Sequence, residues 1–103
     1  MKIFISKLAS KDIVIYGKYL IKEANLKISE DFVSEVKQIL ELILKNPKIG
    51  NSYSNRFIQT KSIRYFIITK YKQIIFYEIN DDVIRIIRIL SSNMDIKNIL
   101  KVT

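Results

Sequence analysis

Residues 62–90 read SIRYFIITKYKQIIFYEINDDVIRIIRIL and carry most of the β-strand character of the chain. Ile, Tyr, Phe and Val dominate three runs, Ser62–Thr69, Lys72–Ile79 and Val83–Leu90, which are separated at Lys70–Tyr71 and at Asn80–Asp82. β-Branched and aromatic residues favour strands, whereas Asn and Asp favour tight turns. The stretch therefore predicts a meander of three antiparallel strands. Upstream, Arg56–Thr60 offers a fourth strand.

The last of these strands is apolar on both faces. Alternation places Ile84, Ile86, Arg88 and Leu90 on one face and Val83, Arg85, Ile87 and Ile89 on the other. A strand of this kind is expected in the middle of a sheet, covered on both sides over much of its length. Arg88 then needs an acidic partner, for which Asp95 and Glu78 are the candidates.

Two amphipathic helices are predicted upstream of the strands. After a short strand at Ile3–Ile5, Ser6 or Ser10 offers an N-cap, and an apolar stripe of Ile13, Tyr16, Tyr19 and Leu20 follows from Lys11 onward. Ser29 offers the N-cap of the second helix, whose inner face is Phe32, Val36, Ile39, Leu40 and Ile43 and which Pro47 and Gly50 end.

These elements together predict an α+β fold. The connector between the helices is short, so the helices are expected to form an antiparallel hairpin. The hairpin covers one face of a three- to four-stranded, mainly antiparallel sheet, and the N-terminal strand precedes it. A chain of 103 residues is the size of one domain, so we expect a single domain over residues 1–103.

The composition excludes several kinds of chemistry. Hydrophobic residues make up 49% of the chain, which is typical of a globular protein. With no Cys and no His, the chain has no thiolate nucleophile, no disulfide and no common neutral-pH base or metal ligand. We therefore expect no metal and no cofactor. Charged residues interrupt every apolar run before it reaches the length of a membrane span, so we expect a cytoplasmic protein.

The net charge of +8 is concentrated in one segment. No acidic residue lies between Glu41 and Glu78, whereas seven basic residues do: Lys45, Lys48, Arg56, Lys61, Arg64, Lys70 and Lys72. Tyr53, Phe57, Tyr65 and Tyr71 interleave with them. This pattern is typical of surfaces that meet phosphates and bases. The alternative is that these aromatics are ordinary strand residues.

One catalytic scheme does not require His. In RNA cleavage, Lys or Arg can stabilise the developing charge on phosphorus, and Lys or Tyr can assist proton transfer. The residues for it are Lys61, Arg64, Lys70, Tyr71 and Arg85, although their spacing forms no motif.

Four motifs resemble those of the RelE/ParE superfamily of toxins from type II toxin–antitoxin systems. Ala9-Ser10-Lys11-Asp12-Ile13, with Tyr16 and Tyr19 beyond it, resembles the opening Ala-x-x-Asp-Leu/Ile stretch of that superfamily. Pro47-Lys48-Ile49-Gly50 and Ile75-Phe76-Tyr77 resemble its Pro-x-x-Gly and Ile-Phe-Tyr motifs. Arg88-Ile89-Leu90-Ser91-Ser92-Asn93-Met94-Asp95 resembles the ending of ParE-type members, with Ser91 and Asn93 where the family has His and Arg.

The resemblance implies a ParE-like toxin that inhibits DNA gyrase and hence replication, and not an enzyme. It also implies a ParD-like antitoxin that forms a hetero-oligomer with the toxin and connects it indirectly to DNA. Charge complementarity predicts that the antitoxin offers an acidic, amphipathic segment. The candidates for target binding are Arg56, Lys61, Arg64, Lys70, Lys72, Ser91, Asn93, Met94 and Asp95.

The superfamily also suggests an alternative function. A RelE-like, ribosome-dependent mRNA endoribonuclease would act on the ribosome and mRNA, using Arg64 with Lys61, Lys70 or Arg85.

Overall fold

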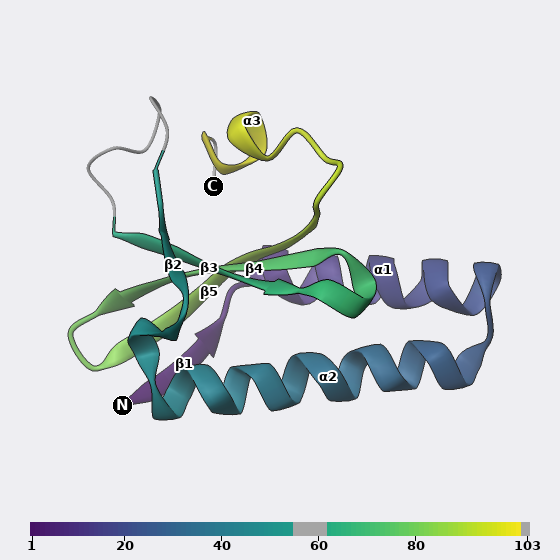
Figure 1. Cartoon of the computed structure of the whole chain (residues 1–103), viewed down its shortest axis with the longest axis horizontal. Helices are drawn as coiled ribbons and strands as arrows, with labels where there is room; N and C mark the ends of the chain where they lie inside the picture. The colour runs from purple at the N-terminus through teal and green to yellow at the C-terminus, as the bar shows by residue number, and fades with distance from the viewer. Residues whose placement is uncertain (55–61, 102–103) are drawn as a thin grey trace.

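The computed structural model describes residues 1–54 and 62–101. A sheet is covered by two long helices on one face and by a short helix on the other (Figure 1). The elements in chain order are β1 (Lys2–Ile5), α1 (Lys7–Glu23), α2 (Leu26–Lys45), the 3₁₀ turn η1 (Pro47–Ile49), β2 (Asn51–Tyr53), β3 (Ile63–Ile68), the 3₁₀ turn η2 (Thr69–Tyr71), β4 (Gln73–Asn80), β5 (Val83–Ser91) and α3 (Ile96–Lys101). In the described ranges, no helix is long and apolar enough to cross a membrane.

The sheet has five strands in the order β1-β5-β4-β3-β2. β3, β4 and β5 form the predicted antiparallel meander, and β1 extends it by pairing parallel with β5. The strand paired antiparallel with the outer edge of β3 is β2, at Asn51–Tyr53. The predicted strand at Arg56–Thr60 lies outside the described residues. The prediction of an α+β fold is confirmed, with more strands than expected.

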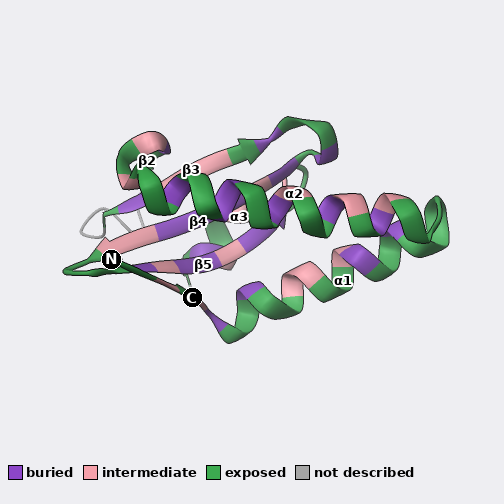
Figure 2. Cartoon of the chain, turned by 90° about the horizontal axis from the view of Figure 1, so that it is seen from below, coloured by how far each residue is buried: buried purple, intermediate pink, exposed green. Residues whose placement is uncertain are grey.

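The helical hairpin of α1 and α2 covers one face of the sheet, as predicted (Figure 2). All five apolar residues assigned to the inner face of α2 are buried: Phe32, Val36, Ile39, Leu40 and Ile43. The helix begins at Leu26, however, because Asn25 accepts from the Ile28 amide and forms the N-cap. The predicted cap, Ser29, is buried inside the helix and donates its hydroxyl to the Gly17 carbonyl of α1 at 2.8 Å. It therefore joins the two helices.

Ser6 joins α1 to the sheet. As one of the two predicted caps, it accepts from the Ala9 amide at 3.0 Å, so α1 begins at Lys7. Its hydroxyl also donates to the Ile87 carbonyl, and its backbone N–H donates to the Ile86 carbonyl. β1 ends at Ile5, and these two bonds from Ser6 continue the hydrogen bonding between β1 and β5.

Asp12 of α1 closes the next part of the β5 edge. Its carboxylate accepts from the Ile89 backbone N–H at 3.0 Å and from Arg88 Nε and Nη2 at 2.8 and 2.9 Å. Asp12 is thus the partner of Arg88, and the predicted partners were wrong. Glu78 instead pairs with Arg85, and Asp95 accepts from the Asn98 side chain.

A β-bulge changes the predicted faces of β5. Tyr77 of β4 pairs with Ile86, but the preceding Phe76 pairs with Arg88, so Ile87 is an extra residue. Past the bulge the alternation is reversed. Ile84, Ile86 and Ile89 therefore pack in the core under the long helices, and Ile87 and Leu90 pack in the core on the opposite face. The predicted burial of both faces and the predicted face of Ile87 are confirmed, but the predicted faces of Ile89 and Leu90 were wrong.

The core on the opposite face is covered by α3. Leu100 of this helix is buried in a cluster with Ile63, Phe76, Ile87 and Leu90. Figure 1 shows α3 on the side of the sheet away from α1 and α2.

Gly50 lies where the chain leaves the helical hairpin and enters β2. The Tyr77 hydroxyl accepts from the Gly50 amide at 2.9 Å and donates to the Pro47 carbonyl at 2.7 Å. Burial raises the pKa of Tyr77, although the Gly50 amide and Arg64 oppose this effect. A Cβ on Gly50 would lie 2.6 Å from the Tyr77 hydroxyl and 2.8 Å from the Tyr65 carbonyl oxygen. Since its φ is −74°, Gly50 is needed for space and not for an unusual backbone conformation.

We expect Gly50→Ala to destabilise the protein by about 2 kcal/mol, because overpacking forces Tyr77 or the β3 backbone to move. Urea denaturation would measure the change. Gly17→Ala is the matched control, since its Cβ would meet only the Ser29 hydroxyl at 3.3 Å and Ala favours the helix. Equal losses of stability for the two variants would contradict the steric explanation.

We expect Asp12→Ala to cost about 3 kcal/mol of unfolding free energy, because it leaves the Arg88 charge and the Ile89 N–H without their acceptor. The side chains of Asp12 and Arg88 are 10% and 17% exposed, so water replaces the lost contacts poorly. The control is Asp31→Ala, which breaks the Lys27–Asp31 pair, whose side chains are 81% and 41% exposed. That exposed pair should contribute less than about 1 kcal/mol. A small effect at Asp12, measured by urea denaturation, would refute its role.

Candidate functional site

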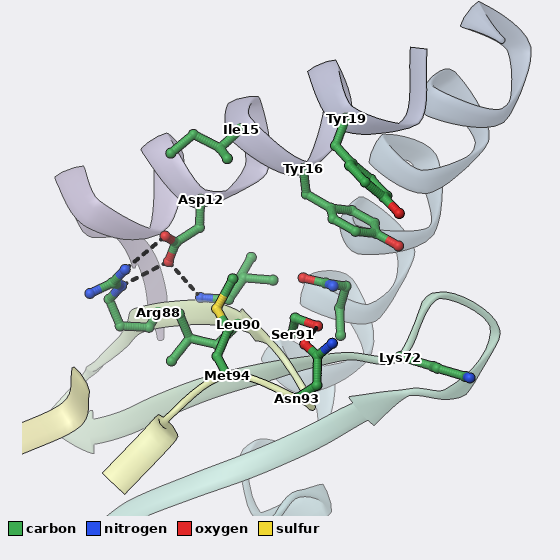
Figure 3. Close-up of a pocket in the computed structure, with 12 residues that line it drawn as sticks. Asp12, Ile15, Tyr16, Tyr19, Lys72, Arg88, Leu90, Ser91, Asn93 and Met94 are labelled. Carbon is green, nitrogen blue, oxygen red and sulfur yellow. Dashed lines mark hydrogen bonds and ion pairs between the residues drawn. The ribbon is translucent and has the colours of Figure 1, made fainter. Parts of the chain in front are cut away.

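A groove of about 560 Å³ lies between α1 and the ends of β4 and β5 (Figure 3). Its walls come from α1, from the junction of η2 and β4, from the end of β5 and from the segment that follows β5. The lining residues are Asp12, Ile15, Tyr16, Tyr19, Lys72, Gln73, Arg88, Ile89, Leu90, Ser91, Asn93 and Met94. Most of these were not predicted as site residues.

The α1 wall is apolar and exposed. Ile15 and Tyr19 are 58% and 53% exposed, and Met94 across the groove is 47% exposed. The rings of Tyr16 and Tyr19 stack with their centroids 5.5 Å apart. Because α1 also sends Ile13, Tyr16 and Leu20 into or against the core, it has a second apolar side beyond the one that the fold buries.

Tyr16 is fixed at the inner end of this wall. Its hydroxyl donates to the Tyr71 carbonyl at 3.1 Å, and its ring packs edge-on against Phe32 of α2. Burial raises the pKa of Tyr16, and the neighbouring Tyr19 and Tyr71 add to the increase, while Gln73 opposes it. The hydroxyl is therefore a neutral hydrogen-bonding group at physiological pH.

Gln73 at the start of β4 is a polar residue of the groove that is only 2% exposed. Its side-chain nitrogen, Nε2, is buried and has no hydrogen-bond partner among the described residues. The amide influences the pKa of Tyr16 without reaching hydrogen-bonding geometry with it. An amide donor in this position offers a bond to an acceptor that enters the groove.

Asp12 and Arg88 form the end of the groove nearest β1. The hydrogen bonds from Arg88 to Asp12 raise the pKa of Arg88, and this effect exceeds the opposing effect of burial. Figure 3 shows the carboxylate directed at the guanidinium and at the backbone of β5. The charges of the two side chains compensate each other, which suits a structural role.

Four of the nine predicted target-binding residues line the groove: Lys72, Ser91, Asn93 and Met94. Ser91 donates its hydroxyl to Asn93 Oδ1 at 2.6 Å, and the Ser92 amide donates to the Lys72 carbonyl. The η2 turn and the segment after β5 are therefore adjacent. Lys70 in that turn lies 5.5 Å from the centre of the Tyr71 ring, and Asp95 lies beyond the groove, before α3.

The remaining basic candidates do not join this cluster. Arg64 donates to the Gly50 carbonyl at 2.7 Å and pairs in the sheet with Tyr77, on the face covered by the long helices. Arg85 is the cross-strand partner of Glu78, which also pairs with Ile63 of β3. Ile63 belongs to the core on the face away from the long helices, so Arg85 lies on that face. Arg64 and Arg85 thus lie on opposite faces. Arg56 and Lys61 lie outside the described residues.

The pairing of Asp12 with Arg88, which was not predicted, had a signal in the sequence. Asp12 and Arg88 both stood in motifs of the resemblance, and a charged pair between the two motifs would have explained both. In the described ranges, no three acidic side chains come together as a metal site would require.

Comparisons with known proteins agree with the resemblance that the motifs indicated. The family model described as "ParE toxin of type II toxin-antitoxin system, parDE" matches residues 3–96. A solved structure from P. aeruginosa, titled a chromosomal ParDE TA system, superposes with a TM-score of 0.75 at 11% identity and covers 88% of this chain and 95% of its own. No curated protein gives a significant match.

The structural similarity establishes the shared fold, and the family match extends from β1 to the start of α3. The motif order, the five-stranded sheet under a helical hairpin and this match agree with one another. The chain therefore belongs to the ParE toxin family of type II toxin–antitoxin systems.

Proposed function

We propose that this toxin inhibits DNA gyrase by binding it, and that a ParD-like antitoxin neutralises it. The observation that carries the proposal is that Lys72, Ser91, Asn93 and Met94 line the same groove. These residues come from the η2–β4 junction and from the ending that resembles ParE-type toxins. A groove that combines an exposed apolar side chain with a cation and small polar groups suits docking onto a protein.

The positions of the basic residues favour binding over RNA cleavage. A ribonuclease would need its cations to converge on one phosphate. Arg64 instead holds the Gly50 carbonyl on one face of the sheet, while Arg85 pairs with Glu78 on the other. The absence of His from the chain leaves proton transfer to Lys or Tyr. We therefore keep the endoribonuclease as the second candidate only.

The partners follow from the same proposal. The antitoxin and the toxin form a hetero-oligomer in the cytoplasm, and DNA is reached through the antitoxin. The net charge of +8 favours an acidic partner and accelerates its association. Ser91 and Asn93, which replace the family His and Arg, provide smaller polar contacts to the target.

We expect the purified chain to abolish gyrase supercoiling of relaxed plasmid and to increase gyrase–DNA cleavage complexes once the toxin is in excess over the enzyme. Met94→Thr should raise the toxin concentration needed about tenfold, as loss of a buried contact at an interface does. Ile67→Thr is the matched control, because Ile67 is 50% exposed, close to the 47% of Met94, and lies away from the groove.

Unchanged supercoiling, in an assay in which an established ParE toxin is active, would refute the gyrase proposal. Expression in cells would then separate the alternatives. Filamentation with a DNA-damage response indicates the gyrase target, whereas cleaved messages that become intact on Arg64→Ala indicate the ribonuclease.

A further inference from the structure

We infer that the groove between α1 and the ends of β4 and β5 binds an acidic segment of the antitoxin. This segment packs an apolar side chain against Ile15 and Tyr19, and one of its oxygen atoms accepts a hydrogen bond from the Gln73 amide. The inference rests on the proposed function, because it names the site at which the proposed ParD-like partner binds.

The buried amide of Gln73 selects the chemistry of the occupant. A buried donor without an acceptor is unfavourable in the free protein, and an acceptor supplied by a ligand removes that cost. Because Nε2 carries only donors, it selects a carbonyl or carboxylate oxygen and rejects a cation. A peptide backbone carries such an oxygen at every residue.

The apolar wall selects a side chain next to that oxygen. Ile15, Tyr19 and Met94 line the groove and are 58%, 53% and 47% exposed. Covering them by an apolar side chain removes this area from water, whereas the free chain leaves it hydrated. An amphipathic peptide that presents apolar residues on one side satisfies both requirements.

The charge of the groove distinguishes a peptide from a nucleic acid. Among the lining residues, Asp12 and Arg88 compensate each other and Lys72 remains as the uncompensated charge. Binding a nucleic acid generally requires a series of cations along its phosphates. One cation beside an apolar wall fits instead a peptide with an acidic residue.

An antitoxin in this position would also cover the proposed target-binding residues. Ser91, Asn93 and Met94 line the same groove as Ile15 and Gln73. A bound segment therefore competes directly with the target for this surface, and neutralisation needs no change of conformation in the toxin.

Gln73→Leu tests the contact with the amide. The probe is a purified ParD-like antitoxin that binds the wild-type toxin, and calorimetry measures its Kd. Losing a buried hydrogen bond should weaken binding about tenfold. The melting temperature of the free toxin should stay the same or rise, because an unsatisfied donor has been removed. A fall in melting temperature with an unchanged Kd would show a purely structural role and overturn the inference.

Two adjacent residues of α1 provide a matched test of the apolar wall. Ile15 lines the groove, whereas Val14, which is 53% exposed, does not. Ile15→Asn should weaken antitoxin binding about tenfold, and Val14→Asn should change it by less than about twofold. Equal effects of the two substitutions would overturn the inference.

Gyrase inhibition by the same variants separates this inference from the proposed function. If Ile15→Asn and Gln73→Leu bind the antitoxin as tightly as the wild type but lose gyrase inhibition, the groove belongs to the target and the inference is wrong. If the wild type leaves gyrase unaffected while both variants lose antitoxin binding, the gyrase proposal fails and the inference stands.

Discussion

The Asp12 carboxylate is the contact on which the arrangement of the groove depends. It holds α1 against β5 by accepting the Ile89 N–H and two bonds from Arg88. Without it, β5 would have an unpaired edge where β1 ends, and α1 would lose its link to the second half of that strand. Ile15, Tyr16 and Tyr19 follow Asp12 on the same helix, so its position determines where the α1 wall lies.

The regular parts of the fold follow from local pattern. The inner face of α2 could be predicted because its apolar residues repeat with the period of a helix, from Phe32 to Ile43. The partner of Arg88 does not follow from local pattern, since 76 residues separate Arg88 from Asp12 and tertiary packing brings them together. The bulge at Ile87 could not be predicted either, because one extra residue in a run rich in isoleucine does not change the sequence pattern.

The candidate site likewise contains residues that could be predicted from the sequence and residues that could not. The ending Ser91–Asp95 could be singled out because it resembles a motif, and three of its residues do line the groove. Gln73 and Ile15 could not be assigned to a site. A Gln at the start of a strand and an Ile on a helix become distinctive only when packing buries the amide of one and exposes the other. Conversely, Arg64 looked catalytic because of its charge, but it supports the turn that contains Gly50.

The short edge strands of the sheet affect how the toxin behaves on its own. β1 spans four residues and β2 spans three, and Ser6 and Asp12 occupy β5 positions beyond the end of β1. Another chain consequently finds few unpaired backbone groups at these edges with which to extend the sheet. The chain therefore has little tendency to polymerise through strand addition at these edges when no partner covers it.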